Sequence, residues 1–166
     1  PVHERPKVAP AGAHERQGIS TNVQSILPAT GSAVATIPRA GSIAEMTASL
    51  RDHGVGALVV SDDGTSIDGI VSERDAVRAM AQHGAAVLGR PVSTCMSGDV
   101  VTCRPGDTID SLMSLMTARR IRHLPVVDDD ERLAGIISIG DVVKARLGEL
   151  ERENDQLHEY IHGNVG

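Results

Sequence analysis

The chain has 166 residues, a formal net charge of −6 and a hydrophobic content of 40%, which suffices for one domain with an ordinary core. The negative charge argues against general binding to nucleic acids or anionic membranes. No apolar run approaches the length of a transmembrane helix, and no signal-peptide pattern opens the chain. We therefore expect a cytoplasmic protein with no membrane or nucleic-acid partner.

The N-terminal segment, residues 1–19, has several prolines, scattered charge and no periodic apolar pattern. This composition is typical of a flexible arm. Residues 20–83 then form a first candidate unit. Ser42-Ile43-Ala44-Glu45 is a capping box that opens a helix. The apolar run Gly69-Ile70-Val71 predicts a strand that leads through Ser72 into a second helix, with Asp75 in its first turn.

Residues 84–91 are rich in Gly and Ala and are expected to connect this unit to a second one at 92–148. There, Val100 to Cys103 predicts a short strand, and the apolar stripe that starts at Ile109 predicts a helix. A hairpin follows, with strands at 123–127 and 133–138 around an acidic turn. Cys95 and Cys103 stand in apolar contexts. Buried free thiols are favoured over a redox or metal pair, and a chain without a cysteine framework fits a reducing compartment.

The second unit repeats the first. A shift of 66 residues superimposes many identical or similar residues, including Thr36 on Thr102, Ile43 on Ile109, Leu58 on Leu124, Ser72 on Ser138 and Asp75 on Asp141. A tandem duplication is the simplest explanation, and a period this long indicates two small subdomains. Each subdomain is predicted to be a β-α-β-β-α unit of the α/β class.

Each unit contains Ser-x-x-Asp where a strand meets a helix. A helix N-terminus offers free backbone N–H groups and a positive dipole end, which suits an anion. The alternative is a capping box, and a single copy would favour that interpretation. Two copies at equivalent places favour a binding role. Hairpin pairing should also place Arg122 and His123 beside Ser138, whereas the first unit has Gly56 and Ala57 at those places, so the two sites differ.

These features resemble a tandem cystathionine-β-synthase (CBS) domain pair, or Bateman module. The resemblance rests on the doubled unit, the Arg-His-Leu-Pro-Val-Val-Asp run at 122–128 and the two Gly-x-x-Ser-x-x-Asp endings, and it covers about residues 20–148. It implies two repeats related by a pseudo-twofold axis, with short lead-in helices at 23–27 and 92–96. It also implies clefts between the repeats that bind AMP, ADP, ATP, NAD-type dinucleotides or S-adenosylmethionine.

The resemblance carries ligand contacts over to nine residues of this chain, which are Thr36, Ser72, Arg74, Asp75, Thr102, Arg122, His123, Ser138 and Asp141. The two aspartates match carboxylates that bind the ribose, because an ionised Asp can accept two hydrogen bonds from a vicinal diol. The serines match hydroxyls near phosphate, and the threonines match the end of the first strand. Arg122 and His123 match basic phosphate contacts, and Arg74 is the substitute in the first repeat. No aromatic residue is placed to stack on adenine, so aliphatic side chains must hold the base.

The resemblance further implies a flat homodimer through helical faces, for which we expect the stripes Ile43/Met46/Leu50 and Ile109/Leu112/Met116 to supply apolar surface. Residues 149–166 form an additional C-terminal helix and tail. Leu147, Leu150, Asn154, Leu157 and Ile161 fall at heptad spacing there, while Glu149, Glu151, Glu153 and Glu159 should keep the other faces solvated. This helix either packs back on its own domain or faces a partner.

Three functions therefore compete. The first is a stand-alone regulatory CBS pair that binds an adenosine nucleotide, with no catalytic residue, catalytic cofactor or metal. The second is a CBS scaffold that mediates assembly without a ligand. The third is a zinc peptidase through His158-Glu159-Tyr160-Ile161-His162, which matches His-Glu-x-x-His. Only four residues follow His162, so no third zinc ligand lies downstream, which disfavours the peptidase.

Overall fold

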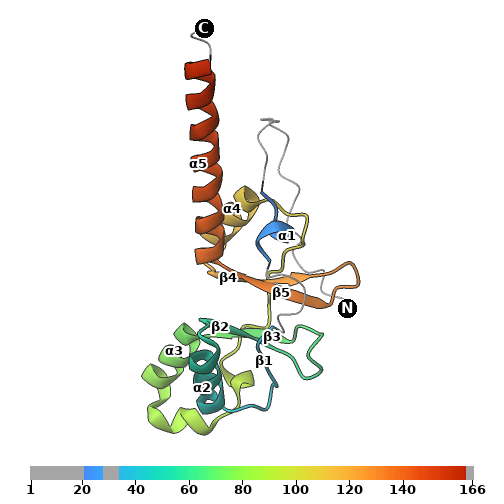
Figure 1. The fold of residues 1–166 in the computed structure, drawn as a ribbon. Coiled ribbons are helices and arrows are strands. Elements are labelled where there is room, and N and C mark those ends of the chain that lie inside the picture. The colour runs from blue at the N-terminus through green and yellow to red at the C-terminus, as the bar shows by residue number, and fades with distance from the viewer. Residues whose placement is uncertain (1–20, 28–33, 164–166) are drawn as a thin grey trace.

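The computed structural model describes residues 21–27 and 34–163, without the side chains of the last two, so the predicted N-terminal arm lies outside the described residues. Two small sheets face each other across the middle of the molecule, and helices cover their outer sides (Figure 1). The elements in chain order are α1 (Val23–Ile26), β1 (Thr36–Ile37), α2 (Ile43–His53), β2 (Ala57–Val60), β3 (Gly69–Ser72), α3 (Glu73–His83), η1 (Ala85–Gly89), η2 (Val92–Thr94), α4 (Ile109–Arg119), β4 (His123–Val127), β5 (Leu133–Ser138) and α5 (Ile139–Gly163).

The first repeat has the predicted β-α-β-β-α order. β1 pairs parallel with β2, and β2 pairs antiparallel with β3. The capping box at the start of α2 is formed, since the backbone N–H of Glu45 donates to Ser42 Oγ (3.1 Å) and that of Ser42 donates to Glu45 Oε2 (2.7 Å). α2 ends at Gly54, whose φ of 63° is in the left-handed region that glycine adopts without strain.

The second repeat differs from the prediction at its first strand. β4 and β5 form the predicted antiparallel hairpin, but Val100 to Cys103 is not a strand. Only Cys103 makes a parallel bridge to β4, through hydrogen bonds with the backbones of Pro125 (3.0 Å) and Val127 (2.9 Å). The pairing stops there because the chain turns at once, with the Arg104 N–H donating to Asp107 Oδ2 (2.8 Å).

The two repeats exchange their lead-in segments. Val23, which precedes the first repeat, is buried in the core of the second, and Val92, which precedes the second, is buried in the core of the first. Each lead-in also bonds to the start of the other repeat's first helix, through Ile109 N–H to the Thr21 carbonyl (3.0 Å) and Ile43 N–H to the Arg90 carbonyl (2.9 Å). Neither repeat can therefore complete its core alone.

The same exchange explains the glycine of each Gly-x-x-Ser-x-x-Asp motif. A Cβ added at Gly69 would lie 2.7 Å from Met96 Sδ, and one added at Gly135 would lie 2.6 Å from Leu27 Cδ2. Met96 and Leu27 belong to the two lead-in segments. A side chain at either glycine would displace the segment that crosses it.

The helical stripes expected to support dimerisation lie in these cores instead. Their members, at most 4% exposed, are Ile43, Met46, Leu50, Ile109, Leu112 and Met116. Each faces the sheet of its own repeat, so none is available to a partner. This part of the prediction was wrong because an amphipathic stripe alone does not reveal what covers it.

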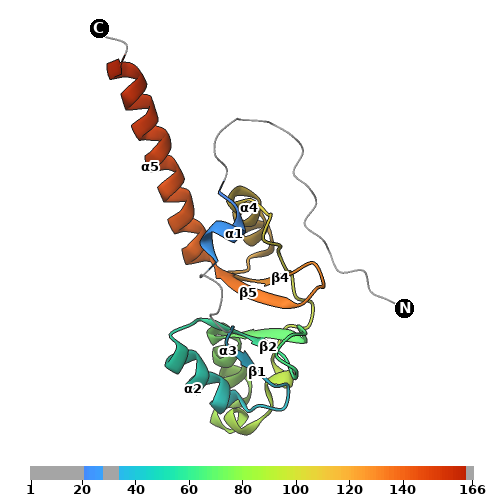
Figure 2. The ribbon, with the colours of Figure 1, turned by 45° about the vertical axis from the view of Figure 1, so that its right-hand side comes forward.

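The predicted C-terminal helix is present, and it is continuous with the last helix of the second repeat as α5. Its outer half extends away from the rest of the molecule (Figures 1 and 2). Leu150, Leu157 and Ile161 are 45–63% exposed, so over these residues the helix does not pack back on its own domain. Glu149 was expected to be solvated but is only 6% exposed. Among the described residues, no helix combines the length and hydrophobicity that a membrane span requires.

Candidate ligand-binding clefts

Asp75 and Asp141 occupy the first turns of α3 and α5, at the ends of β3 and β5. Oδ2 of Asp75 accepts hydrogen bonds from the backbone N–H and the Oγ of Ser72, both at 2.8 Å. Oδ2 of Asp141 accepts the same two bonds from Ser138, also at 2.8 Å. The capping interpretation is therefore correct for one oxygen of each carboxylate. The other oxygen, Oδ1, accepts no hydrogen bond from the part of the chain that the structure describes, so it can bind a ligand.

Each aspartate lines a cavity between a long helix and the exchanged lead-in segment. The first cleft has a volume of about 340 Å³ and is lined by Asp75, Arg78, Ala79, Gln82, His83, Val87, Arg90, Thr94, Cys95 and Ser97. The second cleft has a volume of about 600 Å³ and is lined by Thr21, Asn22, Ser25, Ile26, Asp141, Lys144, Ala145, Gly148 and Arg152.

The two clefts are equivalent under the internal repeat. On the helices, Asp75, Arg78 and Ala79 correspond to Asp141, Lys144 and Ala145 by the shift of 66 residues. On the lead-in segments, Thr94 and Cys95 correspond to Ser25 and Ile26 by a shift of 69 (94 − 25 = 95 − 26 = 69). Each cleft is thus built from both repeats, as the pseudo-twofold arrangement requires.

Two cationic side chains line each cleft, and none of the four was among the predicted site residues. They are Arg78 and Arg90 in the first cleft, and Lys144 and Arg152 in the second. The cations that line the first cleft are thus Arg78 and Arg90, whereas the basic contact predicted there from the sequence was Arg74. Arg78 and Lys144 each follow the aspartate by three residues, which puts them on the same helical face, and this repeated Asp-x-x-cation spacing was a detectable signal. Arg152 lies further along the same face of α5, so only Arg90, which precedes a lead-in segment, depends on the tertiary exchange.

The remaining predicted site residues lie elsewhere. Neither cleft as defined above is lined by Thr36, Arg74, Thr102, Arg122 or His123. Both threonines are half-buried, and the two arginines are exposed. The predicted hairpin register is correct, with His123 directly opposite Ser138. The structure therefore forms both Ser–Asp pairs, but of the nine predicted residues only Asp75 and Asp141 line the clefts as defined above, and Ser72 and Ser138 do not.

His123 packs against the first repeat. A Cβ added at Gly56 would lie 3.2 Å from its Cε1 and Nε2 atoms, so the ring fills the space that a side chain at Gly56 would take. Burial lowers the pKa of His123, and the nearby Arg122 charge lowers it further, against the opposing effect of Glu73 and Asp141. His123 is therefore mainly neutral near pH 7 in the free protein. Its ring becomes mostly charged, and so able to attract a phosphate, only at a pH below its usual pKa.

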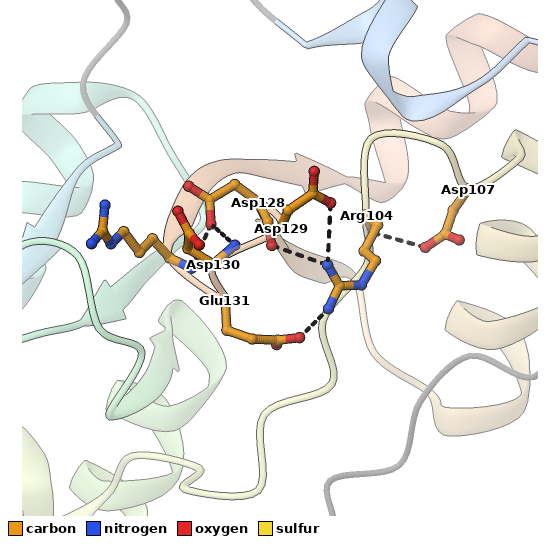
Figure 3. A network of polar contacts seen from close by, with 7 residues as sticks. Arg104, Asp107, Asp128, Asp129, Asp130 and Glu131 are labelled. Atoms are coloured by element: carbon orange, nitrogen blue, oxygen red, sulfur yellow. Dashed lines mark hydrogen bonds and ion pairs between the residues drawn. The ribbon is translucent and has the colours of Figure 1, made fainter.

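The acidic turn between β4 and β5 is bound by Arg104 rather than by Arg122 (Figure 3). The Arg104 guanidinium donates to the Asp128 carbonyl (3.0 Å) and forms ion pairs with Asp129 (3.9 Å) and Glu131. Within the described residues, the Arg122 side chain makes no hydrogen bond or ion pair. Arg104, and not Arg122, therefore neutralises part of the negative charge of this turn.

The cysteines and the His-Glu-x-x-His motif were the other candidate sites. Burial raises the pKa of the Cys103 thiol to about 12, with a contribution from Asp107, and burial also raises the pKa of Cys95. Both thiols are free. The described residues contain no cluster of three or more His, Cys, Asp or Glu side chains that could hold a metal ion. The side chain of His162 lies outside them.

Comparison with known proteins identifies the repeat. The family model for the CBS domain matches residues 29–82 and 92–148. The CBS domain-containing protein CBSX3, mitochondrial, from Arabidopsis thaliana is 38% identical over 119 residues, which cover 69% of this chain and 57% of that protein. The chain thus spans less than two thirds of the length of this curated relative. It also spans less than two thirds of two further curated relatives, with 63% and 61% of their lengths covered.

Solved structures show the same fold. A CBS-domain containing protein from Agrobacterium tumefaciens is 48% identical with a TM-score of 0.72, over 78% of this chain and 96% of that one. A CBS domain protein from Pyrobaculum aerophilum, complexed with AMP, is 27% identical with a TM-score of 0.65, over 73% and 89% of the two chains. The CBS domain pair of protein MJ0100, complexed with 5-methylthioadenosine and S-adenosyl-L-methionine, is 26% identical with a TM-score of 0.69, over 78% and 98%.

Proposed function

Because this chain belongs to the CBS domain family, as a tandem pair of CBS repeats, we propose that it is a regulatory protein that binds an adenosine-containing ligand and has no catalytic activity of its own. The observation that carries the proposal is the repeated Asp at a helix start, with one oxygen fixed by Ser and the other open to a cleft. The AMP and S-adenosylmethionine complexes of related CBS proteins support this ligand class.

In the proposed complex, Oδ1 of Asp75 or Asp141 accepts hydrogen bonds from the ribose hydroxyls. The bonds from Ser to Oδ2 hold the carboxylate in place before the ligand arrives, which reduces the cost of ordering it. A phosphate group would be attracted by the cations of the same cleft, such as Lys144 and Arg152. The residues carried over by resemblance, including Thr36 and Thr102, remain proposed contacts.

Calorimetric titration with AMP, ADP, ATP, NAD and S-adenosylmethionine tests this proposal directly. Asp75→Ala and Asp141→Ala should each cost about 2–3 kcal/mol at the affected cleft, because hydrogen bonds to a charged acceptor are lost, or about 30- to 150-fold in affinity. Asp155→Ala, an exposed change on the outer part of α5, is the matched control. Thermal melts of every variant show whether it is folded, since both site aspartates also cap helices.

An assembly scaffold without a ligand is the second candidate. It would show no heat of binding and no thermal stabilisation with any of the five compounds. We favour the nucleotide-binding function, and with it a role in energy sensing, because both repeats keep the Ser–Asp pair and a cation beside it. We further propose that the protein is a homodimer and that it works in the cytoplasm, where free thiols such as Cys95 and Cys103 stay reduced.

A further inference from the structure

The outer face of α5 has a continuous stripe of exposed side chains. Its members are Val143, Leu147, Leu150, Asn154, Leu157 and Ile161, called the outer stripe below. The five apolar members are 44–63% exposed. Its first and last members are 18 helical steps apart, so the stripe is about 27 Å long. Isolated exposed apolar residues are ordinary, but a continuous row along one helix indicates an interface.

The chain's own domain does not cover this stripe. The side of α5 that packs on the domain contains Val142, Arg146 and Glu149, which lie about 60–120° around the helix axis from the centre of the stripe. Val142 is fully buried, and the guanidinium of Arg146 is 3.6 Å from a carboxylate oxygen of Asp110 on α4. Residues 150–161 are all exposed. A helical segment of this length without tertiary contacts is marginally stable in water, so pairing would stabilise it.

We propose that the outer stripe is the seam of a parallel, two-stranded coiled coil with α5 of a second copy of this chain. The proposal rests on the homodimer proposed above and names a surface for it. The spacings along the stripe are 4, 3, 4, 3 and 4, which place Leu147, Asn154 and Ile161 at heptad position a. Val143 and the two remaining leucines are at d. Leucine at d with one polar a residue is typical of parallel dimers.

Asn154 favours a second copy as the partner and a parallel orientation. In a parallel, in-register pair every a residue faces its own copy, so the two Asn154 amides can bond to each other. An antiparallel pair places a residues opposite d residues, and Asn154 would then face an apolar side chain with its amide unpaired, which is costly. Self-pairing supplies the matching amide automatically, whereas a different protein would have to carry one in register.

The heptad register also sets which flanking residues meet in the same arrangement. In a parallel pair, a residue at g lies near the e residue five positions later on the other helix. This places Glu153 near His158 of the second copy, whereas Arg146 stays paired with Asp110 and Glu149 of its own chain. Because the domain packs on a different side of α5, the twofold axis would put the two domains on opposite sides of the pair.

Disulfide trapping tests the orientation in the full-length protein. Leu157→Cys in a Cys95→Ser background places a thiol at d, facing its own copy in a parallel pair. Glu159→Cys in the same background places it on the outside of the pair and is the matched control. With oxidised glutathione at micromolar protein, Leu157→Cys should form covalent dimers at least ten times faster than Glu159→Cys.

Light scattering tests whether the contact contributes to assembly. The parent should have twice the chain mass of 17.4 kDa, and Leu150→Glu/Leu157→Glu should weaken the dimer at least tenfold, with circular dichroism confirming that the domain remains folded. An unchanged dimer in this variant, or equal trapping of the two cysteine variants, overturns the α5 pairing while leaving a homodimer through another surface. A monomeric parent overturns both, whereas none of these results would overturn the proposal that the chain binds a nucleotide.

Discussion

Replacing Glu149 should reveal how strongly the two repeats depend on each other. Its carboxylate accepts a hydrogen bond from the Thr21 N–H at Oε1 (2.6 Å) and one from Arg146 Nη1 at Oε2 (2.9 Å), so it connects α5 to the exchanged lead-in. Hydrogen bonds to charged groups contribute about 1.5–3 kcal/mol each, and two on one carboxylate are not additive. Glu149→Ala should therefore lower the free energy of unfolding by about 2–3 kcal/mol, or the melting temperature by roughly 4–12 °C.

Urea denaturation measures this loss, and two variants serve as comparisons. Glu149→Gln keeps an acceptor for Thr21 and should lose only about 1–2 kcal/mol. Glu151→Ala is two residues further along α5 and exposed, so it should stay within about 0.5 kcal/mol of the parent. If Glu149→Ala is no less stable than Glu151→Ala, the carboxylate does not tie the repeats together.

The stability that Glu149 contributes should also depend on pH. Burial raises the pKa of Glu149, but hydrogen bonds from Thr21 and Arg146 outweigh this and bring it below the usual 4.5. A carboxylate with a lowered pKa stabilises the folded state above the unfolded-state pKa and loses that contribution as pH falls through the folded-state value. The gap in stability between parent and Glu149→Ala should hold constant above about pH 5.5 and narrow below pH 4.5. A gap that persists unchanged at low pH would contradict the assignment.

Two further predictions concern the contact between the repeats. Gly69→Ala should destabilise the protein by about 1–3 kcal/mol, because its Cβ would lie 2.7 Å from Met96 Sδ and 3.0 Å from the carbonyl oxygen of Ser97. That carbonyl accepts a backbone hydrogen bond from β3, which holds it in place. Gly98→Ala, whose Cβ would meet nothing within 4 Å, is the control in the same urea denaturation series. The His123 imidazole should titrate by NMR below pH 6.5, because burial and Arg122 disfavour its charged form, so AMP affinity should change little between pH 8 and pH 7. A midpoint above 6.5 would show that the ring is not desolvated as described.

The repeat, the element order and the hairpin register were predictable because they depend on local patterns. The Ser72–Asp75 and Ser138–Asp141 bonds follow from four consecutive residues, and the register of His123 opposite Ser138 follows from the hairpin. The strand expected at Val100 to Cys103 did not form, because β propensity does not reveal how early the chain turns.

The lining of the clefts could not be predicted in the same way. Arg90 reaches the first cleft, and Asn22 and Ser25 reach the second, only because the lead-in of each repeat packs on the other. Glu149 stands among charged residues on a polar helix, so its burial was also hidden in the sequence. In each case the information lies in contacts between distant segments, and neither the hydrophobic period nor the motif spacing encodes which segments meet.

α5 joins the second cleft to the outer stripe, and this continuity leads to a final prediction. Asp141 is in the first turn of the helix, Arg152 lines the same cleft from its middle, and Leu157 and Ile161 lie further out on the same uninterrupted element.

A nucleotide that bridges α5 and the α1 lead-in would fix the orientation of the helix relative to the domain. If two copies pair through α5, that orientation also sets the geometry of the pair, so nucleotide binding and pairing must influence each other by the same free energy. AMP should therefore bind the parent and the Leu150→Glu/Leu157→Glu variant with different affinities, although neither leucine lines the cleft. Because each dimer has two copies of this cleft, saturating AMP should shift the dimerisation constant of the parent by the square of the ratio of these affinities. Equal affinities in the two proteins, measured by calorimetry at concentrations where only the parent is dimeric, would show that the cleft and the outer half of α5 act independently.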